Sequence, residues 1–327
     1  MSFRKLAYAI AAVFAASPLL CPAQQPADRN YPSKPIRMVI PVVAGGPFDF
    51  LARTLTQKMP AEMSFVIDNR PGSGTALGTE VVAKANADGY TLLLTSSTHA
   101  SLPVIYKSLP YDAVKDFTPV TIFAESVGFL LVVHPAAASN LQEFIAAARA
   151  NPGKFKYGSA GIGNASHFAA EIFNFKTGVQ TTHIPYKGVV QLMPDLLSGR
   201  IDWSFNPATA FLPHVKAGKL NALGIAASNR WSELPDLPTL DEAGAKGVLF
   251  APWYGMWFPA GTPEQFVNRI RSEVAKVLKD PEVRRTYARE GFVAGSGALS
   301  SADITRKITE EMESNRQLAA RIGLKPE

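Results

Sequence analysis

The sequence is nearly free of cysteine, and this bears on where the protein works. Cys21 is the only cysteine in 327 residues, and it lies inside a segment with the features of an export signal. Once that segment is removed, the chain holds no thiol that could mispair in an oxidising compartment. Lipid attachment to Cys21 is the alternative, ranked second because Leu20 stands where lipoprotein signals carry a small residue.

A run of apolar residues long enough to span a membrane is also lacking at the start of the chain. Arg4 and Lys5 precede an apolar centre, and the small-residue sequence CPA follows it. This order is typical of a signal peptide. A retained anchor needs about 20 apolar residues, and two prolines shorten this stretch. We therefore expect residues 1–23 to be a signal peptide that is cleaved near Ala23.

Strong charge of one sign is absent. The formal net charge is +6, and it falls to +4 when Arg4 and Lys5 leave with the signal peptide. Lys and Arg are scattered along the chain, and no basic stripe is interleaved with aromatic residues. Nucleic-acid binding is therefore disfavoured, whereas a mild preference for small anions is expected.

Motifs for metal, nucleotide or acyl-transfer chemistry are missing. The five histidines show neither H-x-x-x-H nor H-E-x-x-H spacing, which gives no support for a metal site. The sequence GSGTALG misses the dinucleotide fingerprint by one residue, and no Walker-type G-K-[ST] exists. The nucleophile elbow G-x-S-x-G is absent as well. We expect no catalytic residue, no metal and no cofactor.

What the sequence does contain is an alternation of strand and helix patterns, typical of an α/β protein. Hydrophobic residues make up 47% of the chain, which is enough for a packed core, and its length fits two domains. Extended stretches at 117–135 and 251–261 interrupt the alternation, and we interpret them as crossings between two lobes. The prediction is lobe I from residues 24–125 plus 251–327, and lobe II from 126–250.

Small, polar loops follow several predicted strands. They are AGGPFD at 44–49, RPGSGT at 70–75, TSSTHA at 95–100, SAGIGNASH at 159–167 and SFNPAT at 204–209. In open α/β sheets, ligands bind beyond the carboxyl ends of strands, where glycine allows close approach and helix N-termini favour anions. Each loop alone could be a simple turn. Five together indicate a site for a small acidic molecule.

The first of these loops shows the pattern most clearly. Gly45 and Gly46 permit a sharp turn, Pro47 suits the first position of a helix, and Asp49 stabilises its first turn. Phe48 is open to two interpretations. It is either an apolar wall of the ligand site or a core residue on the inner face of the helix, to which its spacing from Leu51 and Leu55 is suited.

Six segments of the sequence resemble the Bug family of periplasmic, TctC-like solute receptors of tripartite tricarboxylate transporters. They are YPSKPIRMVIPVVAGGPFDFLAR, VIDNRPGSGTALGTEVVAKANADGYTLLLTSSTHA, LPYDAVKDFTPVTIFA, GSAGIGNASHFAAEIF, HIPYKG and FPAGTP. The resemblance covers nearly the whole chain beyond the signal peptide, in unbroken order. It implies a type II periplasmic binding protein fold, with two lobes, each a mixed sheet flanked by helices, joined by two crossover strands.

The resemblance also implies a function and a site. The protein would be a periplasmic monomer that closes on a small carboxylate and presents it to membrane permease subunits. We expect a dicarboxylate, with an aromatic, terephthalate-like diacid as a second choice. The implied ligand-binding residues are Gly45, Gly46, Pro47, Phe48 and Asp49; Ser96, Ser97, Thr98 and His99; Gly163, Asn164, Ala165, Ser166 and His167; and Phe205 with Asn206.

One departure from the family pattern leaves the ligand open. Many relatives carry an aromatic residue shortly before the paired glycines and a small polar residue after the following proline, whereas this chain has Val42, Val43 and Phe48. Two other functions are weighed. A secreted hydrolase would use Ser97 or Ser166 with a loop histidine, and a sensing accessory would bind the same ligand without serving transport.

Overall fold

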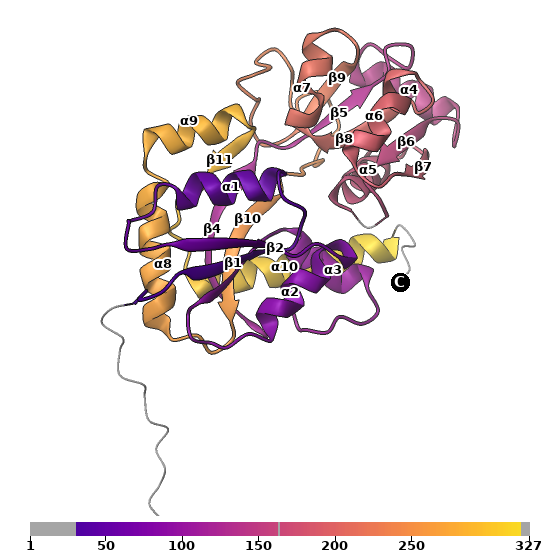
Figure 1. Ribbon diagram of the computed structural model, residues 1–327. Helices are drawn as coiled ribbons and strands as arrows, with labels where there is room; N and C mark the ends of the chain where they lie inside the picture. Colours follow the sequence, from indigo (N-terminus) through magenta and orange to yellow (C-terminus); the bar gives the residue numbers. More distant parts are fainter. Residues whose placement is uncertain (1–30, 163, 322–327) are drawn as a thin grey trace, which may run out of the picture. The chain divides into compact units, whose positions relative to one another are not determined.

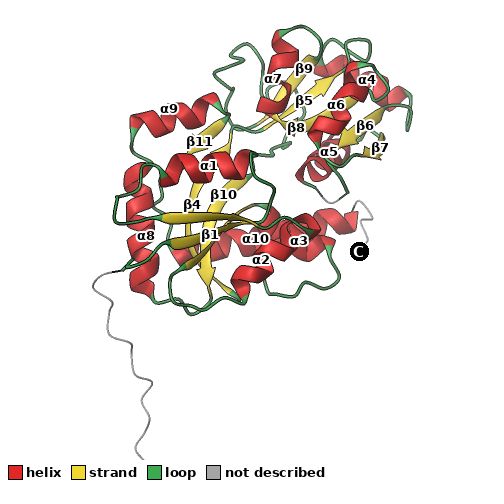
Figure 2. Ribbon diagram, in the orientation of Figure 1, coloured by secondary structure: helices red, strands yellow, loops and turns green. Residues whose placement is uncertain are grey.

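Two mixed β-sheets, each flanked by helices, organise the chain in the computed structural model, which describes residues 31–162 and 164–321 (Figures 1 and 2). We call the sheets and their helices the first and second lobe. The predicted α/β two-lobed fold is thereby confirmed. The predicted signal peptide and Gly163 lie outside the described residues. No helix within those residues has the length and apolar character needed to cross a membrane.

The first lobe is built on a six-stranded sheet with the order β11-β4-β10-β3-β1-β2. β1, β2 and β3 are parallel, β10 pairs with β3 as an antiparallel strand, and β4 pairs in turn with β10 in antiparallel orientation. The strands are β1 (Ile36–Ile40), β2 (Phe65–Asn69), β3 (Thr91–Ser96), β4 (Phe117–Ser126), β10 (Trp253–Pro259) and β11 (Phe292–Ala294), and the helices are α1 (Pro47–Thr56), η1 (Ser73–Thr75), α2 (Ala76–Ala83), α3 (Thr98–Ile105), α8 (Glu264–Val277), α9 (Pro281–Arg289) and α10 (Ser301–Arg321).

The second lobe is built on a five-stranded sheet with the order β7-β6-β8-β5-β9. The strand β5, which lies between β8 and β9, reads FLLVV and is buried on both faces, as expected of a continuous apolar run. Leu131 and Val133 pack in the core with α4 and α5, whereas Leu130 and Val132 pack with α6 and α7. The elements are β5 (Phe129–Val133), β6 (Lys156–Ser159), β7 (Thr182–Pro185), β8 (Trp203–Pro207), β9 (Asn221–Ala226), α4 (Leu141–Ala150), α5 (Ala165–Thr177), α6 (Val189–Leu197) and α7 (Ala208–Lys216).

The chain crosses between the sheets twice, and the crossings are hydrogen-bonded to each other. The amide of Ser126 donates to the carbonyl of Pro252 at 2.8 Å, and the amide of Phe129 donates to the carbonyl of Phe250 at 3.1 Å. The predicted extended stretch 117–135 is therefore two strands. They are separated at Gly128, whose φ of +118° brings the backbone so close to β9 that a Cβ would lie 2.9 Å from the Ala226 carbonyl oxygen. The exact lobe boundaries stay a prediction.

One local prediction is wrong by a single residue. The sequence predicts that Ser139 and Gln142 form the capping box of α4. Instead the Asn140 side chain accepts a hydrogen bond from the amide of Glu143 at 2.9 Å, and the Glu143 carboxylate accepts one from the amide of Ser139 at 2.8 Å. The N-cap residue is therefore Asn140, because asparagine caps as well as serine does, and Glu143 reaches back to the residue before the cap.

Candidate functional site

The carboxyl ends of the parallel strands β1 and β3 lead into α1 and α3, and that of β6 leads into α5. Each junction contains residues that the sequence predicts for a ligand site. The amides of a helix's first turn have no partner inside the helix and attract anions. These three helix N-termini are therefore the places where a carboxylate could be held without an ion pair.

The first loop presents its backbone to open space. Gly45 has a φ of +84°, and neither at Gly45 nor at Gly46 would an added Cβ come within 4 Å of another atom. Gly46 is the N-cap residue of α1 and Pro47 begins the helix, as predicted. Asp49 is buried beneath this turn, where it accepts hydrogen bonds from the Gly45 amide at 3.3 Å and from Arg53 at 2.8 Å.

The bonding of Asp49 fixes its charge. The hydrogen bond from Arg53 is the main cause that lowers the pKa of the Asp49 carboxyl below its ordinary value, and the Gly45 amide lowers it further. Asp49 is thus an ionised anchor inside the loop. Its side chain supports the turn from below, while the glycine backbone forms the accessible surface.

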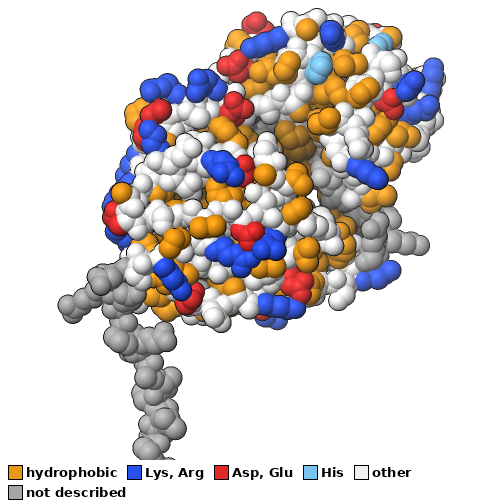
Figure 3. Space-filling model, viewed as in Figure 1, with side chains coloured by type: hydrophobic (Ala, Val, Ile, Leu, Met, Phe, Trp, Pro, Cys, Tyr) orange, Lys and Arg blue, Asp and Glu red, His pale blue; other side chains and the backbone are white. Residues whose placement is uncertain are grey.

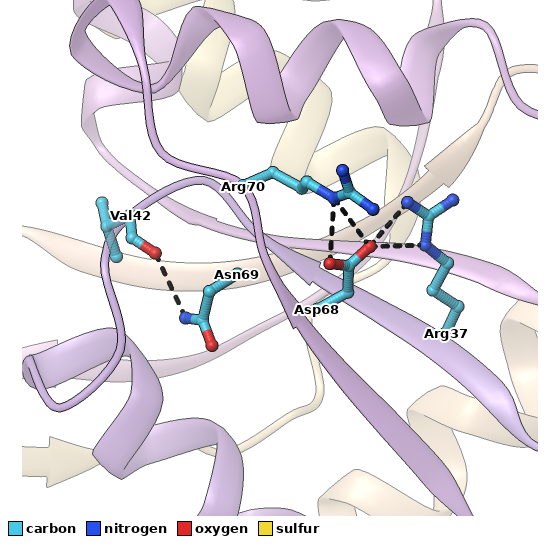
Figure 4. A network of polar contacts seen from close by, with 5 residues as sticks. All are labelled: Arg37, Val42, Asp68, Asn69 and Arg70. Carbon is cyan, nitrogen blue, oxygen red and sulfur yellow. Dashed lines mark hydrogen bonds and ion pairs between the residues drawn. The ribbon is translucent and has the colours of Figure 1, made fainter.

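A polar network ties the same loop to β2 (Figure 4). The Asn69 side chain donates to the Val42 carbonyl at 3.1 Å. Next to it, the Asp68 carboxylate forms ion pairs with the guanidinium groups of Arg37 at 2.6 Å and Arg70 at 2.9 Å. Figure 4 shows that both guanidinium groups converge on Asp68 and leave Asn69 to face Val42. The loop before α1 is consequently fixed at its start by Asn69 and at its end by Asp49.

Phe48 is neither fully in the core nor fully exposed, so neither of its two predicted roles is decided. Its ring is half-buried and meets Tyr254 of β10 edge to face, with centroids 5.1 Å apart and planes at 79°. The fully buried face of α1 is formed instead by Leu51, Ala52 and Leu55. Phe48 is therefore packed on one side and accessible on the other, so a ligand contact stays a prediction.

The second loop, from Ser96 to His99, divides into accessible and buried residues. Ser97 and Thr98 are partly exposed, and the Ser97 amide donates to the Trp253 carbonyl at 3.1 Å. Ser96 is buried, and its hydroxyl lies 3.1 Å from that of Thr98. The loop is short because α3, which the sequence does not predict, begins at Thr98.

His99 lies in the core of the first lobe and is 1% exposed. Its Nε2 donates to the Ala113 carbonyl at 2.8 Å, and its ring packs against Tyr111, Phe117 and Trp257. Burial lowers the pKa of His99 to about 4, so the ring is neutral at pH 7. The side chain thus has almost no surface to offer a ligand, and the predicted contact depends on its backbone.

The third loop leads from β6 to the N-terminus of α5. Asn164 is the N-cap residue, and its side-chain oxygen accepts from the Ser166 amide at 3.1 Å. The Ser166 hydroxyl accepts from the Ala160 amide at 2.8 Å. Ala165 is partly exposed and His167 is buried. The loop is thus closed on itself by side-chain hydrogen bonds.

The fourth predicted position is buried within the second sheet. Phe205 is 0% exposed and packs edge to face on Phe129. The Asn206 side chain donates to the Ser204 hydroxyl at 2.8 Å. Neither side chain lines a surface here, so their contact with a ligand remains a prediction.

A cavity of about 270 Å³ joins residues of the second and third loops. Ser97, Thr98 and Ala165 line it, and the surface is hollowed between the two lobes (Figure 3). A larger cavity of about 820 Å³ lies within the second lobe, between α4 and the 233–238 segment, and none of the predicted site residues lines it. We therefore place the candidate site at the smaller cavity.

Several residues of this cavity were not predicted. They are Ser101, Phe168, Ile172, Leu249, Phe250, Ala251, Pro252, Trp253, Lys307, Glu311, Ser314 and Asn315. Most are apolar or come from α10, which is far away in sequence. Glu311 accepts a hydrogen bond from the Trp253 indole at 2.7 Å, and burial raises the pKa of its carboxyl. Within the described part of the chain, no cluster of three or more His, Cys, Asp or Glu side chains could hold a metal ion.

Comparisons with known proteins agree with this architecture. The model of the TctC family, the tripartite tricarboxylate transporter family receptor, matches residues 50–324. Protein BugT of Bordetella pertussis is 32% identical over 291 residues, covering 87% of this chain and 88% of BugT.

Two solved structures with bound acids are also similar. The structure of R. palustris Rpa4515 with adipate is 31% identical at a TM-score of 0.80, covering 91% of this chain and 100% of that one. MatC from Rhodopseudomonas palustris with bound malate is 28% identical at a TM-score of 0.75, covering 88% and 99%. The family consists of solute-binding receptors rather than enzymes, which removes the hydrolase alternative. The chain belongs to the TctC family of tripartite tricarboxylate transporter receptors.

Proposed function

We propose that this receptor captures a small dicarboxylate between its lobes and delivers it to the permease of a tripartite tricarboxylate transporter. The observation that carries the proposal is that neutral, donor-rich turns follow the strands before α1, α3 and α5, and that residues of the last two turns line one cavity. The free backbone amides at a helix N-terminus can donate hydrogen bonds to a carboxylate, and the helix dipole favours its negative charge. Adipate and malate in the structures of two similar proteins support the ligand class.

The cavity walls favour an acid with an apolar body. Phe168, Ile172 and Phe250 line it together with Ser97 and Thr98. Aliphatic chains and aromatic rings both suit such walls, since burial of apolar area stabilises by about 25 cal/mol per Å². Lys307 also lines the cavity and supplies a positive charge for a second carboxylate. We place terephthalate-like diacids beside aliphatic ones in the ligand class.

The cellular setting is part of the proposal. Residues 1–23 act as a signal peptide cleaved near Ala23, and the mature receptor works in the periplasm as a monomer. Lobe I comprises residues 24–125 plus 251–327, and lobe II residues 126–250. Support comes from the sequence of the signal segment and from the family to which the chain belongs.

Calorimetry with a panel of acids tests the ligand class. Adipate, malate, terephthalate and benzoate are compared with adipamide, which lacks charge. A ligand at 100 times its Kd raises the free energy of unfolding by about 2.7 kcal/mol. We expect binding of at least one diacid and none of adipamide. Absence of binding across all the acids would contradict the proposal.

A matched pair of variants tests the location. Gly45 and Gly153 both have positive φ, +84° and +76°, and both face open space. Gly45→Leu and Gly153→Leu therefore carry similar backbone strain, but only Gly45 is in a predicted ligand loop. We expect Gly45→Leu to weaken diacid binding at least tenfold and Gly153→Leu to leave it unchanged. Equal affinities would remove the first loop from the site.

Delivery is tested separately, by deleting the gene and measuring uptake of the labelled acid that binds. Loss of uptake is expected of a transport receptor. Normal uptake with loss of only a transcriptional response would favour a sensing role instead.

A further inference from the structure

Three aromatic rings from three elements of the second lobe form a stack next to the third loop. The ring of His183 of β7 is nearly parallel to that of Tyr157 of β6, with centroids 4.7 Å apart and planes at 12°, and to that of His167 of α5, at 4.2 Å and 9°. Tyr157 and His167 are themselves 6.5 Å apart, so the stack is offset rather than a straight column. Tyr157 and His183 are paired residues of adjacent parallel strands. The stack therefore fixes the His183 ring in place, and the proposed function gives His183 no role.

His183 reaches the loop through one hydrogen bond. Its Nε2 lies 2.6 Å from the Ser159 hydroxyl, which is at the end of β6. Burial, and the neighbouring His167, lower the pKa of His183 to about 4, so the ring is neutral at pH 7 and one of its nitrogens is an acceptor. The Ser159 hydroxyl can also donate to the Gly161 carbonyl, but at 3.2 Å that contact is longer. The geometry favours donation to His183.

The same hydroxyl holds the start of the loop. Ser159 accepts a hydrogen bond from the Gly161 amide at 3.1 Å, and its hydroxyl proton must point elsewhere for this to form. When the Ser159 hydroxyl donates its proton to His183, its oxygen is free to accept from the Gly161 amide. The far end of the loop is fixed independently, because the Ala160 amide donates to the Ser166 hydroxyl and the Asn164 amide to the Gly161 carbonyl. One side of the turn thus depends on His183 and the other on the α5 cap.

We propose that His183 is a positioning residue for ligand binding, which orients the Ser159 hydroxyl and, through it, the turn from β6 to the N-terminus of α5. His183 would act without touching the ligand. This inference rests on the proposed function, which places a ligand carboxylate at that N-terminus. Tyr157, which stacks on His183, is itself held by a hydrogen bond from its hydroxyl to Glu171 of α5 at 2.5 Å.

Three variants test the inference by calorimetry with the tightest diacid of the panel. His183→Phe keeps a flat ring in the stack and removes the acceptor. Ser159→Ala removes the donor with little change in volume. Loss of one neutral hydrogen bond predicts roughly 3- to 10-fold weaker binding for each. The double variant should bind no more weakly than either single variant, because both remove the same contact.

Rescue by His183→Gln separates positioning from general stability. The Gln side-chain oxygen can accept from Ser159, so binding should recover to within about twofold of wild type, although the stack is lost. His214→Phe on α7 is the control and should bind like wild type. Melting temperatures show whether each variant folds, and Ser159→Ala remains informative should His183→Phe fail to fold.

Two failures are distinguishable in this design. If wild type binds no acid, the proposed function is wrong. If wild type binds, but folded Ser159→Ala and His183→Phe bind equally well, or their effects add in the double variant, His183 does not position the loop.

Discussion

Acid should destabilise this protein through His99, beginning at a mildly acidic pH. His99 is neutral and buried in the first lobe, with a pKa lowered from 6.5 to about 4. Between these values the unfolded chain binds a proton that the folded protein does not, so stability falls as the pH falls. The loss begins near pH 6.5 and is complete below about pH 4.

The magnitude follows from the two pKa values. When the pKa of a group in the folded protein is lower by one than in the unfolded chain, the difference corresponds to about 1.4 kcal/mol. By pH 5 the linkage relation gives a loss of about 2 kcal/mol from His99 alone. Asp49 does not interfere, because its pKa is lowered from 3.8 and its contribution is lost only at lower pH. Half-buried His183, with a pKa of about 4, acts in the same direction and adds to the slope.

Urea unfolding of wild type and His99→Gln at pH 7 and pH 5 checks this. Glutamine can still donate to the Ala113 carbonyl but does not titrate, and comparing two proteins cancels the contribution of every other group. We expect wild type to lose about 2 kcal/mol more than the variant between the two pH values. Equal losses in both proteins would refute the burial of a neutral His99.

Three further outcomes are expected. Gly78→Ala places a Cβ 2.7 Å from the Arg70 carbonyl oxygen. The clash outweighs the small gain in helix propensity, so the free energy of unfolding measured in urea should fall by roughly 1–2 kcal/mol. Gly46→Ala has open space around it and should lower the free energy of unfolding by less than half as much. Phe48→Ala should cost roughly 2 kcal/mol in the same assay, because the ring is only half-buried, and should weaken terephthalate binding more than adipate binding if the exposed side meets the ligand. Lys307→Gln should weaken diacids about 2- to 5-fold in calorimetry and leave benzoate unchanged, whereas an equal effect on both would show that the cavity does not take the second carboxylate.

Periodic, local patterns predicted much of the fold. Leu51 and Leu55 lie on the buried face of α1, as their spacing in the sequence indicates. The stretch 117–135 is extended as predicted, although it forms two strands rather than one. Such features depend on neighbours within one or two turns of chain, which is why a single sequence contains them.

What the sequence did not predict depends on distant contacts. α3 contains Pro103, which usually argues against a helix, yet the segment is helical where it lies beside α10, and Asn315 of α10 donates to the Ala100 carbonyl. Because the sequence does not predict α3, it places His99 in an open loop rather than in the core. The cavity-lining face of α10 escapes prediction for a similar reason, since nothing near Glu311 indicates that Trp253 lies against it.

The strand order of the first sheet has a consequence for folding. β4 pairs only with β10 and β11 among the described strands, and both are made after the whole second lobe. Residues 117–126 must therefore wait until residue 253 is available before they can join a sheet. Pairing across such a sequence distance is slow to form. A nascent chain therefore carries an open, incomplete first lobe until its last quarter has been made.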